Sequence, residues 1–147
     1  MRPLALLVLA HLAALAAAAE ARGGVAGAGL GDDVLGLIVF KADVSDPDGR
    51  LATWSEDDER PCAWDGVTCD ARTGRVSALS LAGFGLSGKL GRGLLRLEAL
   101  QSLSLARNNL SGDVPADLAR LPALQTLDLS ANAFAGAVPE GLFGRCR

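Results

Sequence analysis

The chain has 147 residues, of which 50% are hydrophobic, 21% are charged and only 4% are aromatic, and its net charge at pH 7 is -3. This length allows one domain of modest size. Because the balance is acidic, the sequence offers no basic patch for a nucleic acid backbone, and nucleic acid partners are excluded. With so few aromatic residues, the core must be built from leucine, alanine and valine.

The N-terminal residues 1–21 have the pattern of a secretory signal peptide. Arg2 supplies the positive charge, residues 4–15 form a short apolar run, and residues 17–21 provide a small-residue cleavage context. The alternative is an N-terminal membrane anchor, but a spanning helix needs about 20 strongly apolar residues and this run is shorter and rich in alanine. We therefore expect secretion, an extracellular or cell-surface location, and no membrane segment beyond the signal.

Residues 22–31 are rich in glycine and lack hydrophobic periodicity, which indicates a flexible leader. Asp32 or Asp33 is expected to cap the helix that follows. The helix should end by Ser45, because the sequence at 46–49, Asp-Pro-Asp-Gly, favours a turn. Its predicted apolar face, which would cover the first of the repeats described below, consists of Val34, Leu35, Ile38, Val39 and Ala42.

Two tryptophans flank an acidic run ahead of the repeats. We interpret Trp54 and Trp64 as core side chains beneath the capping helix; the alternative is a pair of exposed ligand anchors. The acidic residues 56–59 are interpreted as a solvated loop, with a metal or partner site as the alternative.

Residues 79–142 repeat with a period of 24 residues. Two leucines separated by one residue point to the same side of a short strand, so both enter the interior. Such a unit must stack on copies of itself, and its period and L-x-L-x-x-N core are typical of a leucine-rich repeat. Asn108 and Asn132 are expected to bond turn backbone groups. The coinciding positions are Leu79, Leu103 and Leu127; Leu81, Leu105 and Leu129; and Gly88, Gly112 and Gly136.

The L-S-G-x-V-P block at residues 110–115 resembles the plant-specific class of leucine-rich repeat, found in receptor-like kinases, receptor-like proteins and polygalacturonase inhibitors. The L-S-G triplet recurs at residues 86–88. The first repeat departs from the pattern, because Phe84 replaces the asparagine and residues 90–91 are Leu-Gly where the pattern has Val-Pro. The third has Phe-Ala at residues 134–135 where the pattern has Leu-Ser.

The motif C-x-W-x-G-V-x-C, from Cys62 to Cys69, resembles the N-terminal cap of plant leucine-rich-repeat ectodomains. The resemblance implies a disulfide between these cysteines, and secretion would provide the oxidising compartment. A zinc site would need nearby histidine or further cysteine, and the only histidine, His11, lies within the signal. Cys146 is interpreted as a small buried residue at a leucine position; the alternative is a reactive or intermolecular thiol.

The resemblance implies an α/β fold: a right-handed leucine-rich-repeat solenoid with short parallel strands and an N-terminal helical disulfide cap. Residues 32–74 would form the cap and residues 75–147 about three repeats, incomplete at the C-terminus. In function it implies a non-catalytic extracellular interaction module, the N-terminal part of a receptor that sits in the plasma membrane in full-length relatives. A protein or peptide, or another leucine-rich-repeat ectodomain, would be the partner. The alternatives are a polygalacturonase inhibitor, which would need many more repeats, and a short soluble co-receptor or decoy.

Residues 83–88 match the G-x-G-x-x-G pattern of phosphate-binding loops. Such a loop must open a helix whose N-terminus holds the phosphate, whereas Lys89 and the two residues after it continue the repeat. The sequence contains no kinase catalytic loop, metal triad or nucleophile–base pair. We therefore predict no catalytic residue, no cofactor and no metal, and expect that the chain is not an enzyme.

Two kinds of site are predicted on the repeats. Asn109 begins an N-x-S sequon, which predicts glycosylation of a secreted chain. Three short strands offer about 250 Å² of outward surface, less than the roughly 800 Å² per partner of a specific interface, and they carry no aromatic anchor. The outward strand residues predicted to face a ligand are Ala78, Ser80, Ala82, Ser102, Ser104, Ala106, Thr126, Asp128 and Ser130, with Arg107 at the edge.

Overall fold

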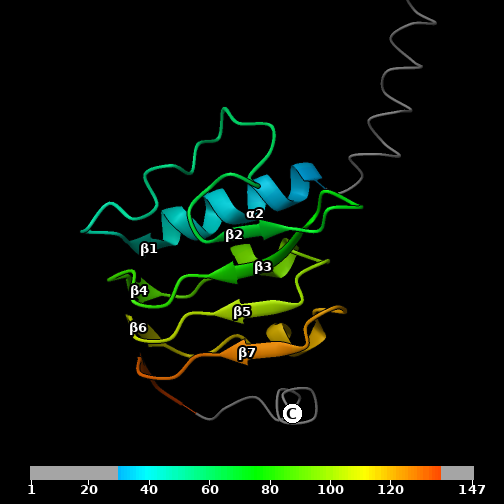
Figure 1. Ribbon diagram of the computed structural model, residues 1–147. Helices are drawn as coiled ribbons and strands as arrows, with labels where there is room; N and C mark the ends of the chain where they lie inside the picture. The colour runs from blue at the N-terminus through cyan, green and yellow to red at the C-terminus, as the bar shows by residue number, and fades with distance from the viewer. Residues whose placement is uncertain (1–29, 137–147) are drawn as a thin grey trace, which may run out of the picture.

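The computed structural model describes residues 30–136, so the predicted signal peptide and Cys146 lie outside the described residues. Helix α2 (Leu30–Asp43) is followed by a stack of short strands in two sheets (Figure 1). The first sheet has the order β2 (Val67–Cys69), β3 (Val76–Ser80), β5 (Ser102–Ser104), β7 (Thr126–Asp128). The second has the order β1 (Val44–Ser45), β4 (Ser87–Lys89), β6 (Asn109–Gly112), β8 (Ala133–Phe134). Two 3-10 helices, η1 (Gly93–Arg96) and η2 (Ala116–Arg120), precede β5 and β7.

The leucines of successive repeats stack in register. Strands β3, β5 and β7 pair in parallel, with Leu79 opposite Leu103 and Leu103 opposite Leu127. The next leucine continues the ladder, because the Leu81 N–H donates to the carbonyl of Ser104 at 2.9 Å. The side chains of Leu79, Leu81 and Leu103 are all 0% exposed. The predicted solenoid of short parallel strands with a helical disulfide cap is therefore confirmed.

The second sheet was not predicted. It is built from the L-S-G segments, and β4 pairs in parallel with β6 so that Gly88 lies opposite Leu110. Glycine recurs in these strands because the backbone adopts positive φ, 96° at Gly88 and 77° at Gly112, which side chains with a Cβ rarely adopt. Serine and glycine are poor strand formers, so residue propensity gave no signal for these strands.

Asparagine side chains bond successive turns of the solenoid to each other. The Asn108 Nδ2 donates to the carbonyls of Leu81 and Leu105, each at 2.9 Å, and its Oδ1 accepts from the Leu86 N–H at 3.0 Å. Asn132 repeats the arrangement one repeat later, with its Nδ2 donating to the carbonyl of Leu105 at 2.8 Å. The predicted role of both asparagines in satisfying turn backbone groups is confirmed.

In the first repeat, Phe84 occupies the position of these asparagines. Its ring is only 6% exposed. The guanidinium carbon of Arg50, which comes from the cap, lies 4.0 Å from the ring centroid. In the first repeat, a cation–π contact between Phe84 and Arg50 of the cap therefore replaces the asparagine amide that, in the other repeats, forms hydrogen bonds to the preceding turn.

The buried face of helix α2 agrees only in part with the predicted one, since Val34 and Ile38 pack against the core as predicted but are only partly buried. Leu37 and Phe40 are 0% exposed, whereas Leu35 is 45% exposed and Ala42 is also exposed. The prediction was wrong for Leu35 and Ala42 because the helix is apolar on most sides, so periodicity alone does not select one face. The position of Gly36 decides which face of α2 is buried. A Cβ on Gly36 would lie 2.6 Å from the carbonyl oxygen of Gly93, so only glycine allows α2 to approach η1 this closely.

The sequence predicts that Asp32 or Asp33 caps the helix. This prediction was wrong for Asp33, because α2 begins earlier, at Leu30. Its carboxylate instead accepts from the Nε and Nη2 of Arg75 at 2.8 and 2.9 Å and from the N–H of Val76 at 3.1 Å. The Asp33 side chain is 0% exposed and that of Arg75 is 16% exposed. The hydrogen bond from Arg75 to Asp33 is the main cause that raises the pKa of the guanidinium above its ordinary value. This buried pair ties the helix to the start of β3.

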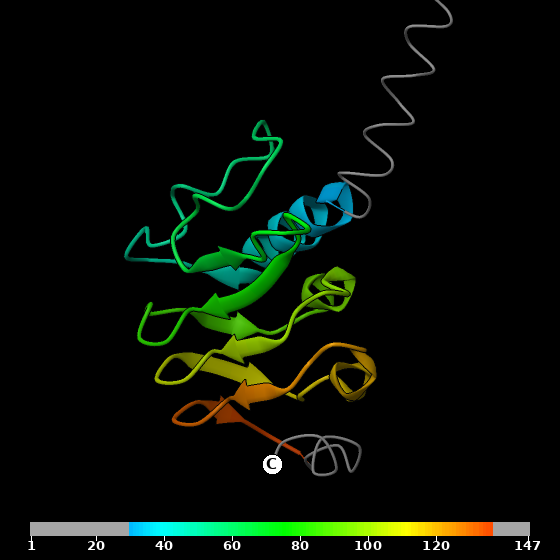
Figure 2. The same ribbon diagram turned by 45° about the vertical axis from the view of Figure 1, so that its right-hand side comes forward.

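The cap also closes one edge of each sheet. Strand β2 pairs antiparallel with β3, and β1 pairs antiparallel with β4, so the first repeat leaves no unpaired edge on the cap side. Trp54 and Trp64 are 1% and 4% exposed, and their rings stack with centroids 5.6 Å apart. Both are core side chains, as predicted. In Figure 2 the strands run down one side of the stack, while α2, η1 and η2 lie along the other.

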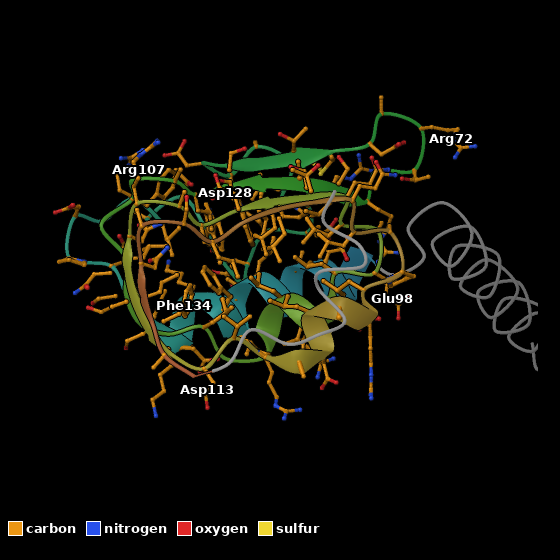
Figure 3. The ribbon with its side chains drawn as sticks, turned by 90° about the horizontal axis from the view of Figure 1, so that it is seen from below. Arg72, Glu98, Arg107, Asp113, Asp128 and Phe134 are labelled. Atoms are coloured by element: carbon orange, nitrogen blue, oxygen red, sulfur yellow. A yellow bond between two sulfur atoms is a disulfide. The ribbon has the colours of Figure 1, made fainter. Side chains whose placement is uncertain are left out.

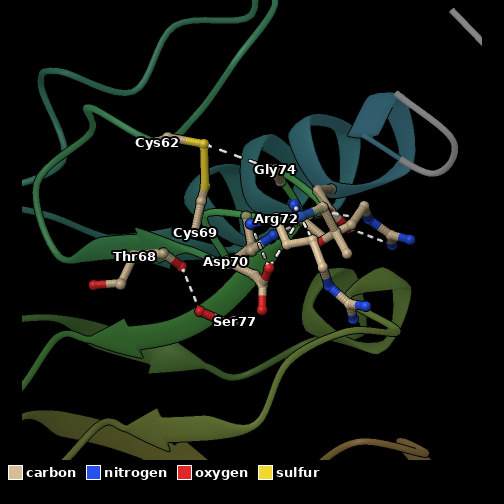
Figure 4. Close-up of a disulfide and its surroundings, with 11 residues drawn as sticks. Cys62, Thr68, Cys69, Asp70, Arg72, Gly74 and Ser77 are labelled. Atoms are coloured by element: carbon tan, nitrogen blue, oxygen red, sulfur yellow. Dashed lines mark hydrogen bonds and ion pairs between the residues drawn. A yellow bond between two sulfur atoms is a disulfide. The ribbon is translucent and has the colours of Figure 1, made fainter. Parts of the chain in front are cut away.

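A disulfide joins Cys62 to Cys69, with their Cα atoms 5.5 Å apart (Figure 4). It links the loop after α2 to strand β2, which pairs with the first repeat. Replacing both cysteines by serine should lower the free energy of unfolding by about 2.5 kcal/mol through lost loop-closure entropy. The loss should appear as a lower melting temperature by circular dichroism, and reduction of the wild-type chain should reproduce it. An unchanged melt after thiol titration has verified reduction would contradict the expectation.

Candidate protein-binding surface

The outward side chains of β3, β5 and β7 form one continuous surface, the strand face. Parallel pairing places Ser80 beside Ser104 and Ser104 beside Asp128, and a second row runs through Ser102 and Thr126. The structure thus brings the predicted ligand-facing residues of three repeats to one side of the first sheet. Those residues are Ser80, Ser102, Ser104, Arg107, Thr126, Asp128 and Ser130.

Exposure varies along the strand face. Ser80, Thr126 and Asp128 are exposed, and Ser104 is half-buried. Ala106, which was predicted to face outward, is only 3% exposed. The reason is that β5 ends at Ser104, so the alternation of a strand does not extend to residue 106. The backbone then turns through a positive φ of 55° at Arg107, whose side chain is exposed.

Asp128 is the acidic residue of this surface, and the basic residue Arg107 lies close enough to affect its pKa. Its Oδ1 accepts from the Ser130 hydroxyl at 2.6 Å and from the Ser130 N–H at 3.0 Å. These bonds, the hydroxyl bond first, lower the pKa of the Asp128 carboxyl below its usual value, and the charge of Arg107 adds to the effect. Figure 3, a view from below, labels both residues on the same side of the molecule. The strand face therefore presents a fixed, ionised carboxylate among short hydroxyl side chains.

Metal ions and phosphate groups each require a particular local geometry. Within residues 30–136 there is no group of three or more His, Cys, Asp or Glu side chains that would hold a metal ion. The G-x-G-x-x-G match at residues 83–88 leads directly into β4, so it has no helix N-terminus with which to hold a phosphate. The described helices include none that is long and apolar enough to cross a membrane.

Asn109, the sequon residue, lies on a different side of the molecule from the strand face. It begins β6 in the second sheet, where its backbone pairs with Ser87, and its side chain is exposed. Ser111, the third sequon residue, donates its hydroxyl hydrogen to the carbonyl of Gly88 at 3.3 Å. A glycan on Asn109 would therefore be attached to the second sheet and not to a strand of the strand face.

Known families match both parts of this architecture. The leucine rich repeat N-terminal domain matches residues 30–70, and the leucine rich repeat matches residues 85–134. Residues 30–70 thus match a leucine-rich-repeat N-terminal cap and residues 85–134 match leucine-rich repeats, and both are similar to the ectodomains of plant leucine-rich-repeat receptors. Among curated relatives of this ectodomain, the probable LRR receptor-like serine/threonine-protein kinase IRK of Arabidopsis thaliana is 63% identical over 71 residues, which are 48% of this chain and 7% of the relative. The brassinosteroid LRR receptor kinase BRL3 of Oryza sativa subsp. japonica is 46% identical over 77 residues, 50% of this chain and 6% of the relative.

Solved leucine-rich-repeat ectodomains share the fold. The BIR2 ectodomain from Arabidopsis thaliana has a TM-score of 0.70 and 37% identity, over 75% of this chain and 60% of that one. The Arabidopsis receptor kinase HAESA, in complex with the peptide hormone IDA and the co-receptor SERK1, has a TM-score of 0.68 and 37% identity, over 78% of this chain and 19% of that one. The chain thus spans only a small part of the curated receptors that it matches, and the match lies in their ectodomain repeats.

Proposed function

We propose that this chain is a non-catalytic extracellular interaction module, the N-terminal part of a plant leucine-rich-repeat receptor, and that it reaches the cell surface through the secretory pathway. Its partner is a protein or peptide ligand, or a second leucine-rich-repeat ectodomain. The family supports this, because similar solved chains include HAESA in complex with a peptide hormone and a co-receptor, and the BIR3–SERK2 complex.

The observation that carries the proposal is the register of the strand face. Ser80, Ser104 and Asp128 line up across three parallel strands, so each repeat adds one row position to the same surface. Three strands supply about 250 Å², roughly a third of what one partner contributes to a specific interface. The strand face of these three repeats therefore offers only part of the area that a specific interface needs.

A pair of charge reversals tests the strand face. Asp128→Lys should weaken binding to a cognate plant leucine-rich-repeat ectodomain or its peptide ligand by at least about tenfold, because it reverses a charge that hydrogen bonds from Ser130 hold in place. Asp113→Lys makes the same change at an exposed residue on the opposite side of the stack (Figure 3) and should alter binding by less than about twofold. Biolayer interferometry against a panel of such ectodomains and peptides provides the measurement. Equal effects of the two variants on binding would count against the proposal.

Glycosylation of Asn109 tests the secretory route. We expect the chain expressed in plant cells to be recovered from the medium and to migrate faster on a gel after treatment with an N-glycosidase. Asn109→Gln and Ser111→Ala should each remove that shift, because both destroy the sequon. Asn108→Gln keeps Asn109 and Ser111 and should retain it. A secreted wild-type chain whose mobility the glycosidase does not change would refute the assignment.

A further inference from the structure

Helix α2 carries a second apolar stripe that is covered only in part: Ile38 packs partly against the core, whereas Leu35 and Ala42 are exposed. Its members follow the i, i+3, i+4, i+7 spacing of one helix side, opposite the side that holds Leu37 and Phe40 in the core. Among residues 30–136, Leu35 is the one large hydrophobic side chain classed as exposed. We call this side the outer helix stripe; it consists of Leu35, Ile38, Val39 and Ala42.

An open hollow of about 440 Å³ adjoins the stripe, within the range of about 300–1,000 Å³ that ligand sites occupy. Ile38 and Ala42 of α2 form one wall together with the stem of Lys41, and residues 54–57 of the following loop form the other. The helix side of the hollow is thus largely aliphatic.

The loop side of the hollow is acidic. Glu56 and Asp57 line it and are exposed, and two further carboxylates, Asp58 and Glu59, follow in the chain. The one cation in the lining, Lys41, donates from its Nζ to the carbonyl of Trp54 at 2.8 Å, which holds its charge against the loop backbone. An incoming cation would therefore meet carboxylates at the rim and aliphatic surface below it.

We propose that the hollow and the outer helix stripe bind a short segment of a partner protein in which arginine or lysine alternates with aliphatic residues. A basic side chain has an aliphatic stem that suits the helix wall and a charged head that suits Glu56 and Asp57. Neighbouring aliphatic residues of the segment would cover Leu35. Helix α2, which carries this surface, lies at the opposite end of the stack from strand β7 (Figure 1), and the proposal does not depend on the strand face.

An NMR titration of the full, disulfide-bonded chain tests this. The probe is an acetylated, amidated hexapeptide in which two arginines alternate with two leucines between terminal glycines. We expect saturable shifts of the amides of Ile38, Ala42 and Glu56. The double variant Glu56→Gln with Asp57→Asn should weaken binding of the peptide by about fivefold or more; both charges are removed together because exposed charge pairs are individually weak. The control variants Asp128→Asn and Glu98→Gln each neutralise an exposed carboxylate elsewhere. Each control should change binding by less than about twofold.

A blocking variant separates the hollow from general charge attraction. Ala42→Arg places a cation in the hollow from the helix itself and should abolish the shifts, while Ala116→Arg makes the same charge change at an exposed residue of η2 and should preserve them. Three outcomes would overturn the proposal. They are equal weakening by both arginine variants, equal binding of a peptide with glutamate in place of arginine, and loss of the amide shifts in the Asp128→Asn variant. If the peptide bound only after deletion of residues 22–29, the leader would be the occupant of the hollow and the proposal would fail. If the same amides shifted with protein concentration alone, the occupant would be a second copy of the chain and the proposal would also fail.

Discussion

Replacing Asp33 by alanine is expected to lower the free energy of unfolding by about 3–5 kcal/mol. The substitution leaves the Arg75 guanidinium, only 16% exposed, without its partner, and it also removes the acceptor of the Val76 N–H. A loss of this size is a large fraction of the stability of a small domain, typically about 5–15 kcal/mol. Urea denaturation followed by circular dichroism gives the measurement.

The neighbouring residue provides the control. The Asp32 carboxylate is exposed and lies 3.9 Å from the guanidinium of Arg96, which is itself about half exposed, so Asp32→Ala should cost no more than about 1 kcal/mol. In the Arg75→Ala background, Asp33→Ala should cost much less than it does alone, because the unpaired cation is no longer present. If the two aspartate variants lost equal stability, Asp33 would not hold the cap to the repeats.

Asn108→Ala should lower the free energy of unfolding by about 2–4 kcal/mol, because it leaves backbone groups of two adjacent repeats without their partner in a part-buried position. The groups are the Leu86 N–H and the carbonyls of Leu81 and Leu105. Hydrogen exchange should show faster exchange of the Leu86 amide than in the wild-type chain.

Asn109→Ala removes the next side chain, which is exposed, and should change stability by less than about 0.5 kcal/mol in unglycosylated protein. The comparison isolates the amide contacts, since both changes delete the same group one residue apart. If Asn108→Ala were as mild as Asn109→Ala, the asparagine ladder would not contribute to the stacking of the repeats.

The sequence predicted the repeat ladder well because its signal is short-range and repeated. Leu79 and Leu81 are two residues apart, which fixes the face of a strand, and a period of 24 residues fixes the partner. The cap helix gave no such signal, since its apolar residues surround most of its circumference. The close approach of Gly36 to Gly93 decides which side is buried, and these residues are far apart in the sequence.

Two further features depended on contacts that no local pattern reveals. Asp33 stands at the start of a helix, where an acidic residue is ordinarily a cap, yet its partner Arg75 lies 42 residues away in the sequence. The second sheet arises because stacking brings L-S-G segments side by side, although Ser87 and Gly88 have little intrinsic strand preference. The strand-face residues could be predicted because the leucine ladder fixes which side chains of each strand point outward. The hollow beside Ala42 could not be predicted, because it depends on the fold of the cap.

The register of the repeats is tested most directly by through-hydrogen-bond scalar couplings in solution, which identify the donor nitrogen and the acceptor carbonyl of each backbone bond. The structure predicts a coupling from the Leu81 nitrogen to the Ser104 carbonyl carbon and another from the Leu105 nitrogen to the Asp128 carbonyl carbon. Couplings from Leu81 and Leu105 to residues of other segments, or full solvent exchange of both amides within minutes, would contradict the stacked solenoid and the binding surface that depends on it.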